Sequence, residues 1–283
     1  MHFTKLIFPF ILLSIGCTDT SQTDTSQTDT SINKLVNGKC IMCDARYTNL
    51  KDLNLNDAIF MGSYFYNSNL SNTNLKGANL QAANFTLANL SHTDISQTNI
   101  RNVKFNEALM FGATLRGADG SLSSFQDANL DSAEFSEANL TTANFSRAIL
   151  DNAFASNANM KSATFSNASL KSIKFDNSDL EGANFSNANL QNARLRMVNF
   201  KNTNFQGADL SNAIIEYSDF SGANLKDVNF NGAILVGLNL TQTNMSNSDF
   251  LNSTMSSLVT EGTLFCDARM PDGNRNISCD TGK

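Results

Sequence analysis

Residues Asn184–Leu190, with the sequence NFSNANL, contain the five-residue pattern that decides the fold of this chain. An apolar residue, here Phe185 and Leu190, occupies nearly every fifth position. A small residue precedes it by two positions, and Asn or Asp stands between the two. From Leu50 to Phe265 the pattern keeps one phase for on the order of forty repeats, far more than a repeat architecture requires.

The five-residue period excludes an amphipathic helix. Apolar residues spaced by five rotate around a helix of 3.6 residues per turn and form no single stripe. In an extended segment, the apolar residue and the small residue two positions earlier point to one side, and the Asn or Asp between them points to the other. The other two positions, usually Ser, Asn, Gly or Lys, favour a turn. Each repeat is therefore predicted to be a short extended segment followed by a corner, and the corners wind the chain into a solenoid.

The spacing of phenylalanine predicts how many repeats make one coil. One set of Phe residues recurs every twenty positions, so four repeats per coil would stack them as a ladder on one side of a square shaft. Ala155 is a small centre whose stack neighbours, Phe135 and Phe175, are large enough to fill its space. Gly120 would stand between Ile100 and Leu140, and we expect a cavity, a bulge or a loosened corner there. The ladder consists of Phe65, Phe85, Phe105, Phe125, Phe145, Phe165, Phe185 and Phe205.

The repeats carry a family resemblance. ANLQAANFTLANL (residues 78–90) and ANLDSAEFSEANLTTANF (residues 128–145) resemble the A(D/N)LXX repeats of the pentapeptide-repeat family. The resemblance implies an all-β fold, a right-handed quadrilateral parallel β-helix, here with about eleven coils over residues 50–265. The closing TLFCDARMPDGNRNISC (residues 263–279) is similar to a terminal segment of envelope or cyanobacterial-type members.

The N-terminal residues predict export. Residues 1–16 have the features of a signal peptide: Lys5 near the start, an apolar run from Leu6 to Ile15 too short to span a bilayer, and small residues before Cys17. A buried N-terminal helix or strand is the alternative. LLSIGC resembles a bacterial lipoprotein signal, which implies lipidation of Cys17. It departs from that signal at Ser14, where Leu is usual, so ordinary secretion with cleavage before Cys17 stays open.

Residues 17–36 are predicted to be a disordered tether, because TDTSQTDTSQTDTS contains no apolar residue. The expected location is the bacterial cell envelope, with lipid on Cys17 as the membrane contact, or the outside of the cell. A cytoplasmic location is less favoured.

The remaining cysteines lie in the two predicted caps, residues 37–49 and 266–283. Cys40 and Cys43 form C-x-x-C, for which we favour a disulfide or packed cysteines. Zinc is disfavoured because the other candidate ligands are distant, and a redox pair because no βαβ context is present. Cys266 and Cys279 flank a Pro-Asp-Gly turn and are positioned for a second disulfide, which a secreted protein permits; free buried thiols are the alternative.

No catalytic set rises above chance in this sequence, and no cofactor or metal site is expected. His92, the one histidine after the signal peptide, falls at a turn position. Larger parallel β-helix enzymes build clefts from long loops, for which an unbroken five-residue phase leaves no room. The formal net charge of -6 disfavours nucleic acid as a partner, because binding to it needs clustered Lys and Arg.

Two kinds of binding protein stay open. The favoured hypothesis is a non-enzymatic, envelope-tethered scaffold or interaction surface with an unknown protein partner, for which Tyr64 and Tyr66 are the candidate patch. The alternative rests on the resemblance, since some pentapeptide-repeat proteins bind gyrase as DNA mimics. An acidic stretch from Asp119 to Asp151 would suit mimicry. The export signal, the weak net charge and the lack of an apolar C-terminal helix speak against it.

Overall fold

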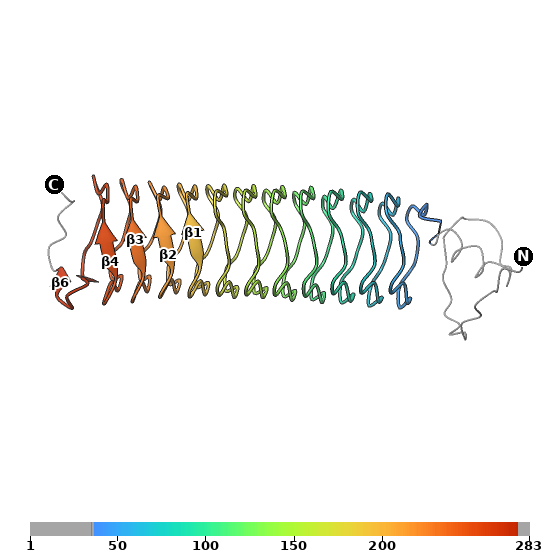
Figure 1. Cartoon of the computed structure of the whole chain (residues 1–283), viewed down its shortest axis with the longest axis horizontal. Helices are drawn as coiled ribbons and strands as arrows, with labels where there is room; N and C mark the ends of the chain where they lie inside the picture. The colour runs from blue at the N-terminus through green and yellow to red at the C-terminus, as the bar shows by residue number, and fades with distance from the viewer. Residues whose placement is uncertain (1–34, 36, 277–283) are drawn as a thin grey trace, which may run out of the picture.

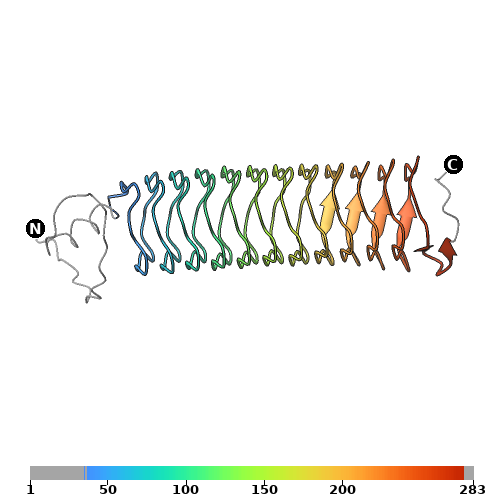
Figure 2. The same ribbon diagram turned by 180° about the vertical axis from the view of Figure 1, so that it is seen from behind.

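The structure is a computed structural model that describes Leu35 and residues 37–276. The described chain forms one straight shaft of stacked coils, which runs from the N-terminal to the C-terminal end without an intervening domain (Figure 1). The view from behind shows the same uninterrupted stack (Figure 2). The predicted signal peptide, Cys17 and residues 18–34 of the predicted tether lie outside the described residues, as does Cys279.

The stack is held together by parallel pairing between residues twenty positions apart. Asn54 pairs with Asn74, Asn74 with Asp94, and the same register continues from Lys39 to Arg269. Each coil therefore contains four repeats and has four sides, as the phenylalanine spacing predicts. The fold is the expected quadrilateral parallel β-helix, and the paired length corresponds to between eleven and twelve coils.

Regular strands are short. On one side of the last coils, β1 (Arg194–Arg196), β2 (Ile214–Glu216), β3 (Ile234–Val236) and β4 (Thr254–Ser256) form a parallel four-stranded sheet in that order. At the C-terminal end, β5 (Ala268–Arg269) pairs antiparallel with β6 (Arg275–Asn276). Elsewhere the extended segments are single bridges between coils.

The core is a column of apolar side chains along the shaft. The predicted phenylalanine ladder is confirmed: from Phe65 to Phe205, rings of successive coils stack with centroids 4.6 to 5.3 Å apart. Ala155, Phe135 and Phe175 are all fully buried. The small residues two positions before each centre also point inward; Ala83 and Ala88, for example, are inaccessible to solvent.

The corners share a left-handed residue. The second residue after each centre has a positive φ in repeat after repeat, as at Asn72 (58°), Asp127 (59°) and Arg147 (60°). Glycine holds the position at Gly62 and Gly77, but most of these residues carry a side chain. The amide that follows the corner donates to the carbonyl of the preceding centre, as from Ala78 N to Leu75 O at 3.0 Å.

Gly120 causes neither a cavity nor a bulge. Parallel pairing and the corner hydrogen bond continue through it, with Ser123 N donating to Gly120 O at 3.1 Å. A Cβ added at Gly120 would lie 2.7 Å from Leu140 Cδ2 and 3.0 Å from Ile100 Cδ1. The expectation fails because these two neighbours lean into the vacant space.

The β-helix extends beyond both predicted boundaries. Leu35, assigned to the tether, is buried, and pairing begins at Lys39 rather than at residue 50. The C-x-x-C motif is therefore part of the first coil, where Cys40 occupies a centre that Leu or Phe usually fills. At the other end, Ala268 is fully buried and Arg269 pairs with Asp249, so one more repeat follows Phe265. Cysteine and methionine at the centres hid these outer repeats in the sequence.

Candidate interaction surface

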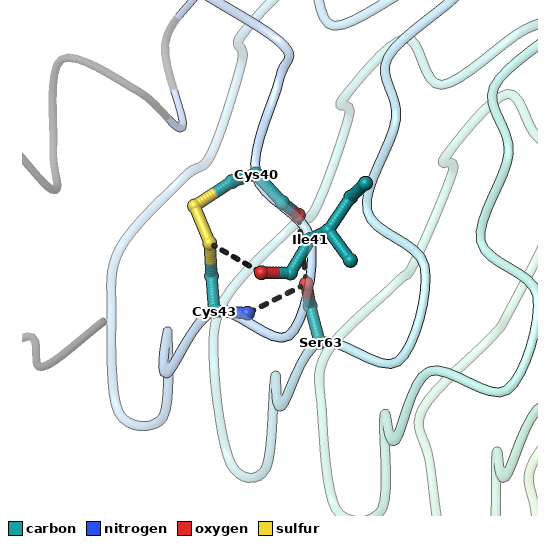
Figure 3. Close-up of a disulfide and its surroundings, with 4 residues drawn as sticks. All are labelled: Cys40, Ile41, Cys43 and Ser63. Atoms are coloured by element: carbon teal, nitrogen blue, oxygen red, sulfur yellow. Dashed lines mark hydrogen bonds between the residues drawn. A yellow bond between two sulfur atoms is a disulfide. The ribbon is translucent and has the colours of Figure 1, made fainter. Parts of the chain in front are cut away.

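A disulfide closes the corner of the first coil. Cys40 and Cys43 are bonded to each other, with Cα atoms 5.6 Å apart, and both side chains are buried. Ser63 of the next coil accepts a hydrogen bond from Cys43 N at 3.0 Å and donates one to Cys40 O at 2.9 Å. Figure 3 shows Ile41 on the short corner that the disulfide closes. The corner is thus covalently closed and tied to the second coil.

Ile41 and Met42 project from this corner into solvent, with exposed fractions of 63% and 69%. Tyr64, on the adjoining side of the shaft, is half exposed and pairs through its backbone with Asp44. At the far end of the same side, the rings of Tyr47 and Tyr66 meet edge to face, with centroids 5.7 Å apart. We call Ile41, Met42, Tyr47, Tyr64 and Tyr66 the N-terminal patch.

Two charged side chains beside the N-terminal patch, Asp44 and Arg46, neutralise each other. Arg46 Nε donates to Asp44 Oδ1 at 2.7 Å, and a second guanidinium nitrogen contacts the other carboxylate oxygen. This side-chain hydrogen bond from Arg46 lowers the pKa of Asp44 below its ordinary value. Asp44 therefore stays ionised at neutral pH, and the patch carries a balanced ion pair.

A second group of exposed apolar residues lies near the other end of the shaft. Ile214 and Ile234 point outward from β2 and β3, and Met197 and Tyr217 occupy the following corner in successive coils. Lys201 and Asp219 form an ion pair at 3.3 Å and line a shallow depression with Met197 and Tyr217. We call Met197, Ile214, Tyr217 and Ile234 the C-terminal patch.

Both patches place large apolar residues where the backbone is left-handed. Positive φ angles occur at Met42 (54°), Tyr47 (60°), Met197 (55°) and Tyr217 (55°). A left-handed conformation is unfavourable for residues other than Gly, Asn and Asp. Exposure of a large apolar side chain is a second cost. The sequence signal that finds these residues is a large apolar residue two positions after a centre, where most repeats have a polar residue or glycine.

The acidic stretch is not a continuous negative surface. Asp127 accepts two hydrogen bonds from Arg147, at 2.7 and 2.8 Å, and these lower the pKa of Asp127. Arg116 pairs with Glu137 at 2.6 Å, and Arg101 lies 3.5 Å from Asp119. The stacking of the coils brings each of these basic residues beside an acidic one, so the paired charges largely cancel.

The other sequence candidates take structural positions. His92 lies at a corner with φ of 57°, and its ring meets Phe111 edge on, with centroids 5.2 Å apart. No group of three His, Cys, Asp or Glu in the described part of the chain is arranged to hold a metal ion. Cys266 is disulfide-bonded, while Cys279, the partner predicted for it, lies outside the described residues. Leu35 and residues 37–276 contain no helix with the length and apolar character needed to cross a membrane.

Comparison with known protein families gives two matches. The model described as "Pentapeptide repeat region" matches residues 149–225. The model described as "Pentapeptide repeats (8 copies)" matches residues 43–77, 68–106, 104–141 and 223–257. Together the matches cover well over half of the chain. A search of curated proteins returned no significant match.

Solved structures with similar folds include HetL, a pentapeptide repeat protein involved in heterocyst differentiation regulation from the cyanobacterium Nostoc sp. Strain PCC 7120. It is 22% identical over 87% of this chain and 97% of its own, with a TM-score of 0.44. Full-length QnrB1, a plasmid-mediated fluoroquinolone resistance protein, is 16% identical over 78% of this chain and 93% of its own, with a TM-score of 0.35. A pentapeptide repeat protein from the Arabidopsis thaliana thylakoid lumen is 25% identical over 36% of this chain and 68% of its own, with a TM-score of 0.30.

Proposed function

The chain belongs to the pentapeptide-repeat family, and from this premise we propose that it is a non-enzymatic scaffold, tethered to the bacterial cell envelope by a lipid on Cys17. Residues 1–16 serve as the signal peptide and the residues after Cys17 as the spacer. The β-helix is the rigid body that the spacer holds near the membrane. Its contact surface is the N-terminal patch, which includes Tyr64 and Tyr66.

The observation that carries this proposal is the unbroken stack from Lys39 to Arg269. A shaft with no loop inserted between coils has no walls from which to build a substrate cleft. It does present flat sides of fixed geometry along its length, which suits a spacer or a binding surface. The disulfide in the first coil fits an oxidising compartment, where such bonds persist.

The alternative, a gyrase-binding DNA mimic, has less support. Mimicry of duplex DNA needs a sustained negative surface, whereas Asp127, Glu137 and Asp119 are each beside an arginine. It also needs a cytoplasmic protein, which conflicts with the export signal in residues 1–16.

The test is cell fractionation of the wild-type chain and a C17S variant expressed in the same bacterial host. We expect the wild type in the membrane fraction and the variant in the soluble periplasmic or secreted fraction. Both forms in the cytoplasm, together with inhibition or protection of gyrase by the purified rod, would overturn the scaffold proposal in favour of the alternative.

A further inference from the structure

We propose that the N-terminal patch binds the surface of the lipid bilayer beside the anchor, so that the shaft is held at the membrane by its first two coils as well as by the lipid. This inference rests on the proposed envelope tether and names what the patch contacts. The same patch would otherwise expose four large apolar or aromatic side chains to water, with Tyr66 partly buried beside them.

The composition of the patch suits the bilayer interface. Tyrosine is enriched where headgroups meet water, because its ring is apolar and its hydroxyl is polar. Ile41 and Met42, the two most exposed apolar residues of the first corner, have the character of side chains that enter the headgroup and acyl boundary. The Asp44–Arg46 ion pair leaves no net charge on these two side chains beside the patch.

The patch is rigid before it binds. The disulfide and the two hydrogen bonds to Ser63 fix the corner that presents Ile41 and Met42. Tyr47 and Tyr66 hold each other edge to face. Because the backbone of this corner and the two tyrosine rings are already ordered, binding loses less conformational entropy than it would in a flexible loop.

The position of the patch distinguishes it from the C-terminal patch. Cys17 and Leu35 are 18 residues apart in sequence, which corresponds to roughly 24 Å root-mean-square for a random coil of that length. Tyr217 lies more than eight coils beyond Tyr47, about 40 Å along the shaft at the usual strand spacing. An anchor on Cys17 therefore holds the N-terminal patch nearer to the bilayer, on average, than the C-terminal patch.

The chain contains no tryptophan, which provides a direct test. The variants Y47W and Y217W each introduce one Trp at the second residue after a centre, with the same left-handed backbone, on opposite corners of the shaft. The full chain is purified from bacterial membranes in detergent and reconstituted into phosphatidylcholine vesicles with or without bromine on the acyl chains. We expect brominated lipid to reduce the fluorescence of Y47W at least twofold and to leave Y217W unchanged.

A second pair of variants tests the chemistry of the patch. Adding I41N and M42N to Y47W should abolish most of the quenching, whereas adding M197N should not. Equal quenching of Y47W and Y217W would overturn the membrane contact while leaving the anchor intact. Absence of quenching in both variants, although the protein sediments with the vesicles, would have the same meaning. If the protein is dimeric and the Y47W fluorescence is shifted to shorter wavelength but not quenched, the patch contacts a second copy of the chain. That result would also overturn the membrane contact. A protein that does not sediment with vesicles would contradict both the anchor and the contact.

Discussion

The repeat is most restricted at its inward positions, whereas its left-handed corner position prefers Asn, Asp and Gly but accepts many other residues. The second residue after each centre must adopt a left-handed backbone, which favours Asn, Asp and Gly. The centre must be apolar because it lies in the column. The position between the inward pair faces outward, and its Asn and Asp side chains cap the next corner, as when Asn84 Oδ1 accepts from Thr86 N at 3.0 Å.

Leu122 combines the wrong backbone preference with exposure, since its φ is 63° and 66% of its surface is accessible. We expect L122N to stabilise the protein by about 0.5–1 kcal/mol, because Asn tolerates the left-handed conformation and little buried area is lost. The measurement is the midpoint of denaturant unfolding. Asn102 occupies the same corner one coil earlier, so N102L is the reverse control and should destabilise by a similar amount. Destabilisation by L122N would show that Leu122 makes a stabilising contact.

The phenylalanine ladder should carry much of the local stability. Phe145 is fully buried between Phe125 and Phe165, so F145A is expected to cost about 3–5 kcal/mol through lost burial and the cavity left behind. Phe154, partly exposed and 4.3 Å from Lys174 Nζ, is the matched control. F154A should cost no more than about 1 kcal/mol. Similar losses for both variants, compared by denaturant unfolding, would argue against the ladder as the core.

At the scale of the coil, the sequence predicts much of the architecture because each rule repeats. The five-residue phase places every centre, and phenylalanine at intervals of twenty predicts four sides per coil. The β-helix extends beyond its predicted boundaries because Cys40, Ala45 and Met270 are atypical centres. The prediction at Gly120 is wrong because a sequence does not show that neighbouring side chains lean into a gap. The sequence predicts only part of the patches. Tyr64 and Tyr66 face outward in the repeat and can be picked from it, whereas the corner geometry that exposes Met42 and Met197 is seen only in the structure.

The disulfide of the first coil should stabilise only that end of the shaft, because each coil contacts only its neighbours. Closing so short a loop is worth about 2 kcal/mol by the chain-entropy account. In the C40S/C43S double variant we expect amides of the first coil, such as Met42 N bonded to Met61 O, to exchange with solvent at least tenfold faster. The exchange rate of the Phe145 amide, in the middle of the shaft, should be unchanged. An equal increase in its exchange rate would contradict independent local opening.

The described part of the chain forms one flat-sided body with two distinct ends. At the N-terminal end, the structure describes a disulfide-closed corner and an apolar patch, following the residues expected to carry the anchor. At the C-terminal end, β5 and β6 turn back on the last coil and cover a strand edge that would otherwise be open. A rigid body with a covered far end and an apolar near end fits a protein held beside a surface.

The envelope tether is tested most directly by the intact mass of the mature N-terminus from the native host, with membrane and soluble fractions analysed separately. We expect a chain that begins at Cys17, carries diacylglycerol and an N-acyl group, and is found in the membrane fraction. An unprocessed Met1 in the cytosolic fraction would contradict the anchor, the export signal and the membrane contact together.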